Sequence, residues 1–332
     1  MPEEWDRNEN SKVNMIVLLT LLSYLIGSIF ISLINETAVQ LVLIQCFCLA
    51  PGIAATVIFR KKDMSVGRAF ADTYRIRKVK ISTLLLVALM MLFLMPLLTL
   101  INLLSQFVTS YVASEEIVDR IADYPFIVSL LCVGIIPAVG EELTYRGFMY
   151  GHYRKRSILM GAVLTGLIFG LMHGNLNQLA YAAVMGFVFA MVDEATGSTV
   201  SSMVMHALVN CSSVVIVYYG AEWMAKLTGS EGAEAVNETV EQAMNEAAEL
   251  TPKNLLSYGV VAVIGTYIAY RLYGEIAYRN QTTVQIREDV RTPGRMRALR
   301  DMFTAPLVVT ILVLIGLVVV MEMATRLGWN VS

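Results

Sequence analysis

The chain has 332 residues, of which 56% are hydrophobic and only 16% are Asp, Glu, Lys or Arg. A soluble domain of this size could not bury so much apolar surface, so the composition excludes an ordinary soluble enzyme. Lys and Arg (25) nearly balance Asp and Glu (27), and the net charge of −2 argues against a nucleic-acid partner. The cysteines lie in apolar runs without CxxC spacing, which predicts reduced thiols rather than a disulfide framework or a zinc module; they are Cys46, Cys48, Cys132 and Cys211.

Apolar runs close to the roughly 20 residues that cross a bilayer recur along the chain. The first run has no small-residue cleavage site, so we expect it to remain as a span rather than to be removed as a signal peptide. The pattern predicts an all-α, polytopic helix bundle: a single integral membrane domain over residues 1–332 with eight or nine transmembrane helices around an intramembrane cavity. The predicted spans are 13–34, 38–59, 81–107, 125–145, 158–172, 178–192, 200–219, 255–272 and 305–323.

The basic residues are distributed unevenly between the predicted loops. All but four of the 25 Lys and Arg residues lie before the first span or in the segments 60–80, 146–156 and 271–300. Short loops rich in Lys and Arg stay in the cytoplasm, so the pattern predicts nine spans with a cytoplasmic N-terminus. It also predicts a cytoplasmic basic segment, 271–303, that can meet anionic lipid headgroups. The acidic segment 220–253 is then outside, and its part 233–250 is typical of either an external helix or a solvated loop.

Ionisable residues inside spans are costly, so those that remain are candidates for function. Glu141 and Glu142 adjoin in the fourth predicted span and would point about 100° apart on a helix, so they must do different jobs. Glu142 and Arg146 are spaced i, i+4 and could pair, which leaves Glu141 to face a cavity as a general base. The residues alone leave open which glutamate faces the cavity, and they also fit a salt-bridged helix end at the membrane interface.

The two histidines inside predicted spans, His173 and His206, each belong to a residue pair with i, i+4 spacing. Phe169 and His173 would share a helix face, where the aromatic ring could form the wall of a pocket and hold the imidazole. His206 and Asn210 would also project together, and both offer the N–H donors that an oxyanion hole requires. A histidine that only satisfies a structural hydrogen bond would fit the same spacing.

Taken in order, Glu141-Glu142-x-x-x-Arg146, Phe169-x-x-x-His173 and His206-x-x-x-Asn210 resemble the three motifs of the CPBP family. This family comprises type II CAAX prenyl endopeptidases, among them the Ras-converting enzyme, and bacterial bacteriocin-processing and self-immunity relatives. The resemblance covers a core of about residues 125–219. It implies an intramembrane peptidase in which Glu141 and His173 activate water while His206 and Asn210 stabilise the oxyanion. In this mechanism Glu142, Arg146 and Phe169 support the site.

CAAX processing needs a prenylated substrate, whereas the short loops of this chain are typical of a bacterial cell membrane protein, for which such a substrate is not expected. We therefore expect another peptide or a membrane protein as the substrate, cleaved near the cytoplasmic side of the bilayer. The mechanism requires no cofactor; Glu141, His173 and His206 could together hold Zn²⁺, but the chain lacks HExxH and a metal-free site is favoured. The alternative function is a non-catalytic bacteriocin self-immunity or membrane scaffold protein that uses the cavity for binding. A proton-relaying transporter fits less well, because a relay does not need paired donors. No feature of the sequence sets an oligomeric state.

The rise per residue of an α-helix limits how Glu141 and His173 can come together in one site. At ~1.5 Å per residue, Glu141 lies about 15 Å from the basic loop near His152, whereas His173 lies about 24 Å from it if the next helix starts near Ser157. The two can meet only if the helix before His173 tilts or begins outside the membrane plane, or if the fourth helix is broken near Pro137. The sequence therefore predicts an irregular, water-accessible cavity. Gly166 and Gly170 are predicted to let this helix approach the next one closely.

Overall fold

A computed structural model gives the fold of residues 7–109, 124–228 and 251–328, and every regular element in these ranges is a helix. This confirms the all-α class. Eight helical stretches are long and apolar enough to cross a membrane, and the remaining predicted span forms a shorter helix of 15 residues. The segment 233–250, predicted to be an external helix or loop, lies outside the described residues. The long helices are α1 (Arg7–Ile31), α2 (Thr37–Ile58), α4 (Ile81–Ser105), α10 (Leu176–Thr196), α11 (Val200–Thr228), α13 (Pro252–Arg279) and α16 (Ala305–Arg326).

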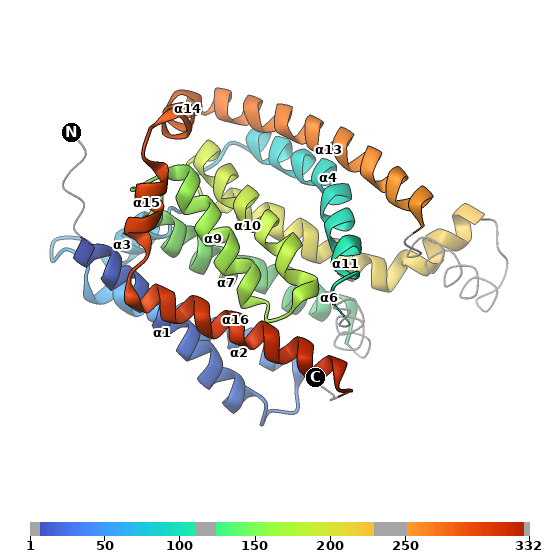
Figure 1. Ribbon diagram of the computed structural model, residues 1–332, viewed down its shortest axis with the longest axis horizontal. Helices are drawn as coiled ribbons and strands as arrows, with labels where there is room; N and C mark the ends of the chain where they lie inside the picture. The colour runs from blue at the N-terminus through green and yellow to red at the C-terminus, as the bar shows by residue number, and fades with distance from the viewer. Residues whose placement is uncertain (1–6, 110–123, 229–250, 329–332) are drawn as a thin grey trace.

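The bundle has three layers (Figure 1). The short helix α9 (Ile158–Met172) and α10 lie in the middle, where α10 is the most buried of the candidate spans. α1, α2 and α16 lie on one side of this pair, and α4 and α13 lie on the other. Short helices α3 (Val66–Thr73), α14 (Thr283–Arg291) and α15 (Arg295–Met302) join the long ones at one end. The middle layer is therefore shielded by helices on both sides.

Two glycines allow the close contact between α9 and α10. A Cβ atom at Gly170 would lie 2.5 Å from the carbonyl oxygen of Leu179, and one at Gly166 would lie 2.7 Å from that of Ala183. Both distances are far inside van der Waals contact, and backbone atoms cannot move aside as side chains can. The prediction that Gly166 and Gly170 form this helix contact is confirmed. Asn175 caps α10 by accepting a hydrogen bond from the Gln178 N–H at 2.8 Å.

We expect Gly170→Ala to destabilise the protein by about 1–3 kcal/mol, because the methyl group must push α9 and α10 apart. Thermal unfolding in detergent measures the effect. Gly316→Ala is the matched control, since Gly316 lies in a long helix and a Cβ atom there would have no other atom within 4 Å. Equal melting temperatures for the two variants would contradict the close-contact interpretation.

The fourth span is continuous but irregular. It runs through α6 (Phe126–Ser129), the π-helical segment η1 (Leu130–Ile135), α7 (Ile136–Glu142), a second π-helical segment η2 (Leu143–Tyr150) and α8 (Gly151–Tyr153). Pro137 has no N–H to offer the carbonyl group four residues back, that of Val133, and the helix changes hydrogen-bonding pattern at this point. The sequence suggested a break near Pro137; the structure has instead two π-helical segments that flank the glutamates in α7.

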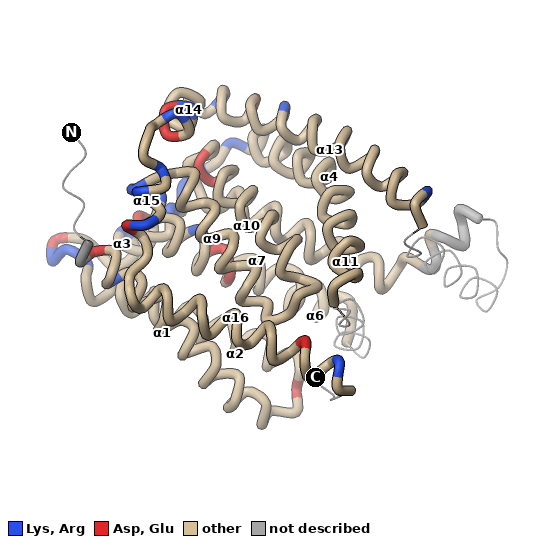
Figure 2. The backbone as a smooth tube through the Cα atoms, viewed as in Figure 1, with Lys and Arg blue, Asp and Glu red and all other residues tan. Residues whose placement is uncertain are grey.

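Charge divides the bundle into two ends. The basic end holds the loop segments 60–80, 154–156 and 279–300, and Figure 2 shows most Lys and Arg positions gathered there, near α3, α14 and α15. Polar contacts fix this end: Arg154 Nε donates to Glu194 at 2.5 Å, and Asp289 accepts from the backbone N–H of Leu159 at 2.9 Å. The opposite end, which we call the distal end, holds the turn 32–36 between α1 and α2 and the turn 173–175 between α9 and α10.

Candidate active site

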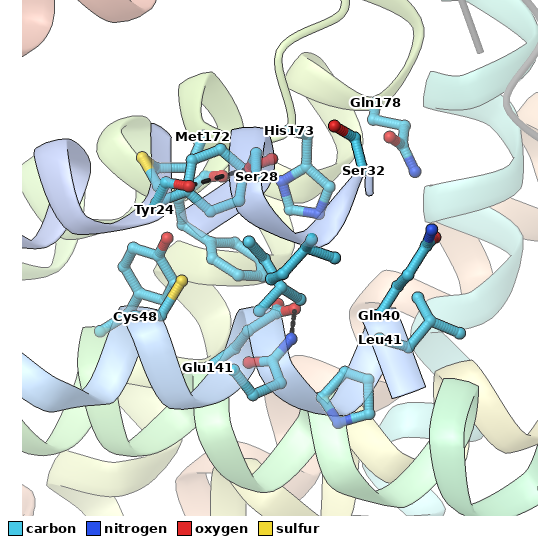
Figure 3. Close-up of a pocket in the computed structure, with 16 residues that line it drawn as sticks. Tyr24, Ser28, Ser32, Gln40, Leu41, Cys48, Glu141, Met172, His173 and Gln178 are labelled. Carbon is cyan, nitrogen blue, oxygen red and sulfur yellow. Dashed lines mark hydrogen bonds between the residues drawn. The ribbon is translucent and has the colours of Figure 1, made fainter. Parts of the chain in front are cut away.

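A cavity of about 620 Å³ lies between α1, α2, α7, α9 and the start of α10. Glu141 and His173 both line it, although their helices are separate, and Figure 3 shows their side chains entering it from α7 and from the end of α9. The irregular cavity predicted from helix lengths is thus present. Its other polar lining residues are Tyr24, Ser28, Ser32, Gln40, Gln45, Tyr145 and Gln178.

The two adjacent glutamates occupy different environments. The Glu141 side chain is 24% exposed and faces the cavity, whereas the Glu142 side chain is 0% exposed. Glu142 Oε1 lies 3.0 Å from Arg146 Nη1, one helical turn away. The pairing of Glu142 with Arg146 that the spacing predicted is therefore confirmed. The geometry also answers which glutamate faces the cavity, a question that the sequence left open.

Arg146 is buried among aromatic rings as well as paired. Its guanidinium carbon lies 4.2 Å from the ring centroid of Phe169, 5.2 Å from that of Phe189 and 5.8 Å from that of Tyr145. Such stacking stabilises a cation through the negative face of each ring. Phe169 thus contacts the ion pair on one side and lines the cavity on the other. The salt-bridged helix end considered from sequence is wrong in one respect: the pair is fully buried, not interfacial.

His206 bridges the two carboxylates. Its Nδ1 lies 2.9 Å from Glu142 Oε1, and its Nε2 lies 3.9 Å from Glu141 Oε2. Because the carboxylate of Glu142 is held by Arg146, the Nδ1 atom of His206 acts as the donor to it, and this bond fixes the plane of the imidazole. The rings of Phe169 and His206 pack in a T-shaped arrangement, with centroids 5.8 Å apart. Glu142 therefore orients the histidine that approaches Glu141.

His173 follows the last residue of α9, and its orientation is set by the same helix. Its Nδ1 lies 2.8 Å from the carbonyl oxygen of Phe169. A carbonyl group only accepts hydrogen bonds, so Nδ1 carries a proton and Nε2 is left for a ligand in the cavity. The imidazole and the Phe169 ring also pack in a T-shaped arrangement, with centroids 4.8 Å apart. The wall-forming position predicted for Phe169 is confirmed.

Asn210 is placed differently from the expectation. It lies on α11 one turn after His206, but neither residue is among those that line the cavity. Its Nδ2 donates to the Val133 carbonyl oxygen at 3.3 Å, the same carbonyl that Pro137 cannot reach with an N–H. The joint projection of two donors into the cavity, predicted from the i, i+4 spacing, is not seen. One N–H of the Asn210 carboxamide stabilises the irregular fourth span instead.

The side chains considered from sequence as zinc ligands are not grouped as a ligand set in the described part of the chain. Among the residues that the structure describes, no three His, Cys, Asp or Glu side chains are grouped so that they could hold an ion. This includes Glu141, His173 and His206, which were the set considered from sequence. The four cysteines, all within described ranges, are free thiols.

Gln45 is a site residue that the motifs did not indicate. It lies on α2, is buried, and its Nε2 donates to Glu141 Oε1 at 3.4 Å. The contact requires a glycine on the facing helix, because a Cβ atom at Gly140 would lie 2.7 Å from Gln45 Oε1. The one available signal was a glutamine in the middle of a largely apolar span. Such residues in a membrane are candidates for interhelical hydrogen bonds.

We expect Gly140→Ala to lower activity more than stability, because the new methyl group displaces the end of the flexible Gln45 side chain from Glu141. The loss of one hydrogen bond to a carboxylate corresponds to roughly 1.5–3 kcal/mol, or about a 13- to 160-fold slower reaction. Hydrolysis rates and melting temperatures measure the two effects. Gly67→Ala, at an open surface position, should change neither. A purely thermal defect in Gly140→Ala would refute the positioning of Glu141 by Gln45.

Comparison with known proteins supports the motif-based resemblance. Residues 123–212 match the family model described as "Type II CAAX prenyl endopeptidase Rce1-like", and this segment contains all three motifs. A stretch of 104 residues is 25% identical to the protein named "Putative membrane peptidase YdiL" of Bacillus subtilis (strain 168). That stretch is 31% of this chain and 42% of the relative, so the match spans less than half of the relative's length. No solved structure matches the chain. The predicted likeness to this group of membrane peptidases is confirmed over the motif-bearing core.

Proposed function

We propose that the protein is an intramembrane endopeptidase that hydrolyses a peptide bond with water activated by Glu141 and His173. The observation that carries the proposal is the exposure of the Glu141 carboxylate in the cavity, opposite His173 and next to the buried Glu142–Arg146 pair. The family match over residues 123–212 supports a peptidase in general terms. The order of steps follows from the chemistry of the groups.

In the proposed reaction, Glu141 takes a proton from a water molecule that His173 Nε2 positions, and the resulting hydroxide attacks the peptide carbonyl carbon. The tetrahedral oxyanion that forms accepts a hydrogen bond from His206, whose Nε2 lies 3.9 Å from Glu141 Oε2; the ring then carries both protons, with Nδ1 donating to Glu142 and Nε2 donating to the oxyanion. Asn210 does not line the cavity and supports the fourth span through Val133 instead. Glu141 then passes its proton to the leaving nitrogen, the C–N bond breaks, and a carboxyl and an amine product result. The Glu142–Arg146 pair holds His206 in place and takes no proton.

The purified protein in lipid nanodiscs, incubated with a library of synthetic membrane-soluble peptides, tests this proposal. We expect new peptide termini with the wild type and with Glu275→Gln, a change to an exposed carboxylate on α13. The His173→Asn variant should be slower by about 10²-fold or more, because the general-base system loses the group that holds the water. A chelator should leave the rate unchanged. Peptides that bind without cleavage by the wild type would favour the self-immunity or scaffold function.

A further inference from the structure

We propose that the cavity opens to the extracytoplasmic side of the membrane and admits an uncharged segment of an exported or membrane-anchored polypeptide from that side. The proposal rests on the proposed function only where it calls this segment a substrate; the direction of the opening is independent of any reaction. It is carried by three observations: the placement of charge, the placement of the cavity rim and the chemistry of the lining.

The distribution of charge fixes the orientation of the bundle. The N-terminus of α1, the ends of α2 and α13, and the starts of α4 and α9 all lie at the basic end, with the Lys- and Arg-rich segments 60–80, 154–156 and 279–300. Segments rich in Lys and Arg remain in the cytoplasm. The three segments are far apart in the sequence but lie at the same end of the structure. Each of them therefore favours the same orientation of the bundle in the membrane, with this end in the cytoplasm. The distal end then faces the outside.

The rim of the cavity lies at the distal end. Ser32 directly follows the last residue of α1 and is exposed, Gln40 is in the first turn of α2, and Gln178 is in the first turn of α10. In Figure 3 these three residues lie together at one side of the cavity, and Cys48 and Tyr24, from the middle of their helices, lie at the other. The cavity therefore extends from mid-bundle, near Glu141, toward the end of the molecule that is remote from the basic segments.

A second contact confirms that the start of α10 belongs to the distal end. Asn177 Nδ2 donates to Ser105 Oγ, at the last residue of α4, at 2.9 Å. Since α4 begins beside Lys78 and Lys80, its last residue marks the opposite end. The rim residue Gln178 is adjacent to this contact. The rim thus lies one full helix length, 25 residues, from the basic loop before α4.

The lining indicates the class of segment that enters. Three glutamine carboxamides and two serine hydroxyls line the route to Glu141, and such groups both donate and accept hydrogen bonds, as peptide groups do. In the described part of the chain, no Lys, Arg or Asp side chain lines the cavity. A charged segment would lose its hydration without gaining an opposite charge, apart from the catalytic groups. The cavity therefore favours an extended, uncharged polypeptide segment.

The sequence predicted a cytoplasmic N-terminus together with cleavage near the cytoplasmic side. The structure separates these two expectations, because the N-terminus of α1 is at the basic end and the cavity rim is at the distal end. If the basic segments are cytoplasmic, the site is reached from outside. Consequently, substrates would be regions that have already crossed the membrane.

Cysteine labelling tests the direction of the opening. In a background with the four native cysteines replaced, Ser32→Cys places a thiol at the rim, and Lys62→Cys places one at an exposed position of the basic end. A membrane-impermeant maleimide should label the Ser32→Cys variant in intact spheroplasts and the Lys62→Cys variant only after permeabilisation. The reverse pattern, or the same pattern for both positions, would overturn the proposal. The readout needs no hydrolysis, so it stands or fails separately from the proposed function.

Protection from labelling tests the class of occupant. Purified Ser32→Cys protein that also carries Glu141→Gln is labelled in the presence of a capped peptide of Leu, Ala, Ser and Gly, or of the same peptide with two internal lysines. The uncharged peptide should slow labelling at least threefold more than the charged one at equal concentration. Equal protection by both peptides, or protection by neither, would refute the uncharged class. Because the variant is used without turnover, a failure here is distinct from an absence of peptidase activity.

Discussion

The Glu141→Gln variant should fold like the wild type and hydrolyse peptides about 10²–10⁴-fold more slowly, the range expected when a general base is removed. Glutamine keeps the size of the side chain and can still accept from Gln45 Nε2, which lies 3.4 Å from Glu141 Oε1. It cannot take a proton from water. Peptide turnover in nanodiscs, with melting temperature as the measure of folding, separates the chemical effect from a structural one.

The matched control for this prediction is Glu275→Gln, which removes a carboxylate of the same type from the exposed surface of α13. It should retain full activity. Wild-type rates in the Glu141→Gln variant would refute the role of Glu141 as base, and a large drop in melting temperature would mean that the residue is needed for folding instead.

Arg146→Met should destabilise the protein by about 3–5 kcal/mol, the cost of leaving one partner of a buried ion pair without the other. Glu142 would keep only His206 as a partner in a site from which solvent is excluded. The guanidinium also fills the space between Phe169 and Phe189, and a methionine side chain fills it without a charge. Chemical unfolding in detergent should show the loss, and activity should fall because Glu142, no longer held by Arg146, orients His206 less firmly.

A double variant distinguishes charge from packing in this prediction. Arg146→Met combined with Glu142→Leu removes both charges and should recover most of the lost stability, since apolar replacements of a buried pair are often neutral. Arg279→Met, which breaks an exposed pair with Glu275, should cost less than about 1 kcal/mol. If Arg146→Met and Arg279→Met were equally stable, the buried pair would not be the structural centre of the site.

The fold was predictable from sequence because bilayer thickness imposes the length and apolarity of each span. The nine predicted runs correspond to nine helical stretches in the described residues, and the pairs Gly166 with Gly170 and Glu142 with Arg146 make the contacts that their spacing indicated. These features depend on position along a single helix or on the absence of a side chain. Local sequence carries that information directly.

The site was less predictable where it depends on how separate helices meet. Helical periodicity could not show whether Glu141 or Glu142 faces the cavity. Which of them does so depends on how α7 is rotated about its axis relative to α1, α2 and α9. Gln45 belongs to a helix with no motif. Because Pro137 has no N–H, the Val133 carbonyl oxygen accepts a hydrogen bond from Asn210 instead. The His206-x-x-x-Asn210 motif alone did not indicate this contact. Each of these contacts joins residues more than 70 positions apart.

The most direct test of hydrolysis at Glu141 is a comparison of cells that express the wild type with cells that express Glu141→Gln, grown in H₂¹⁸O-enriched medium. Mass spectrometry of membrane and exported peptides should find fragments present only with the wild type, with ¹⁸O in the new carboxyl terminus because water is the attacking group. Matching peptide profiles from two equally well-folded proteins would contradict hydrolysis at Glu141 and favour a cavity that binds a peptide without cleaving it.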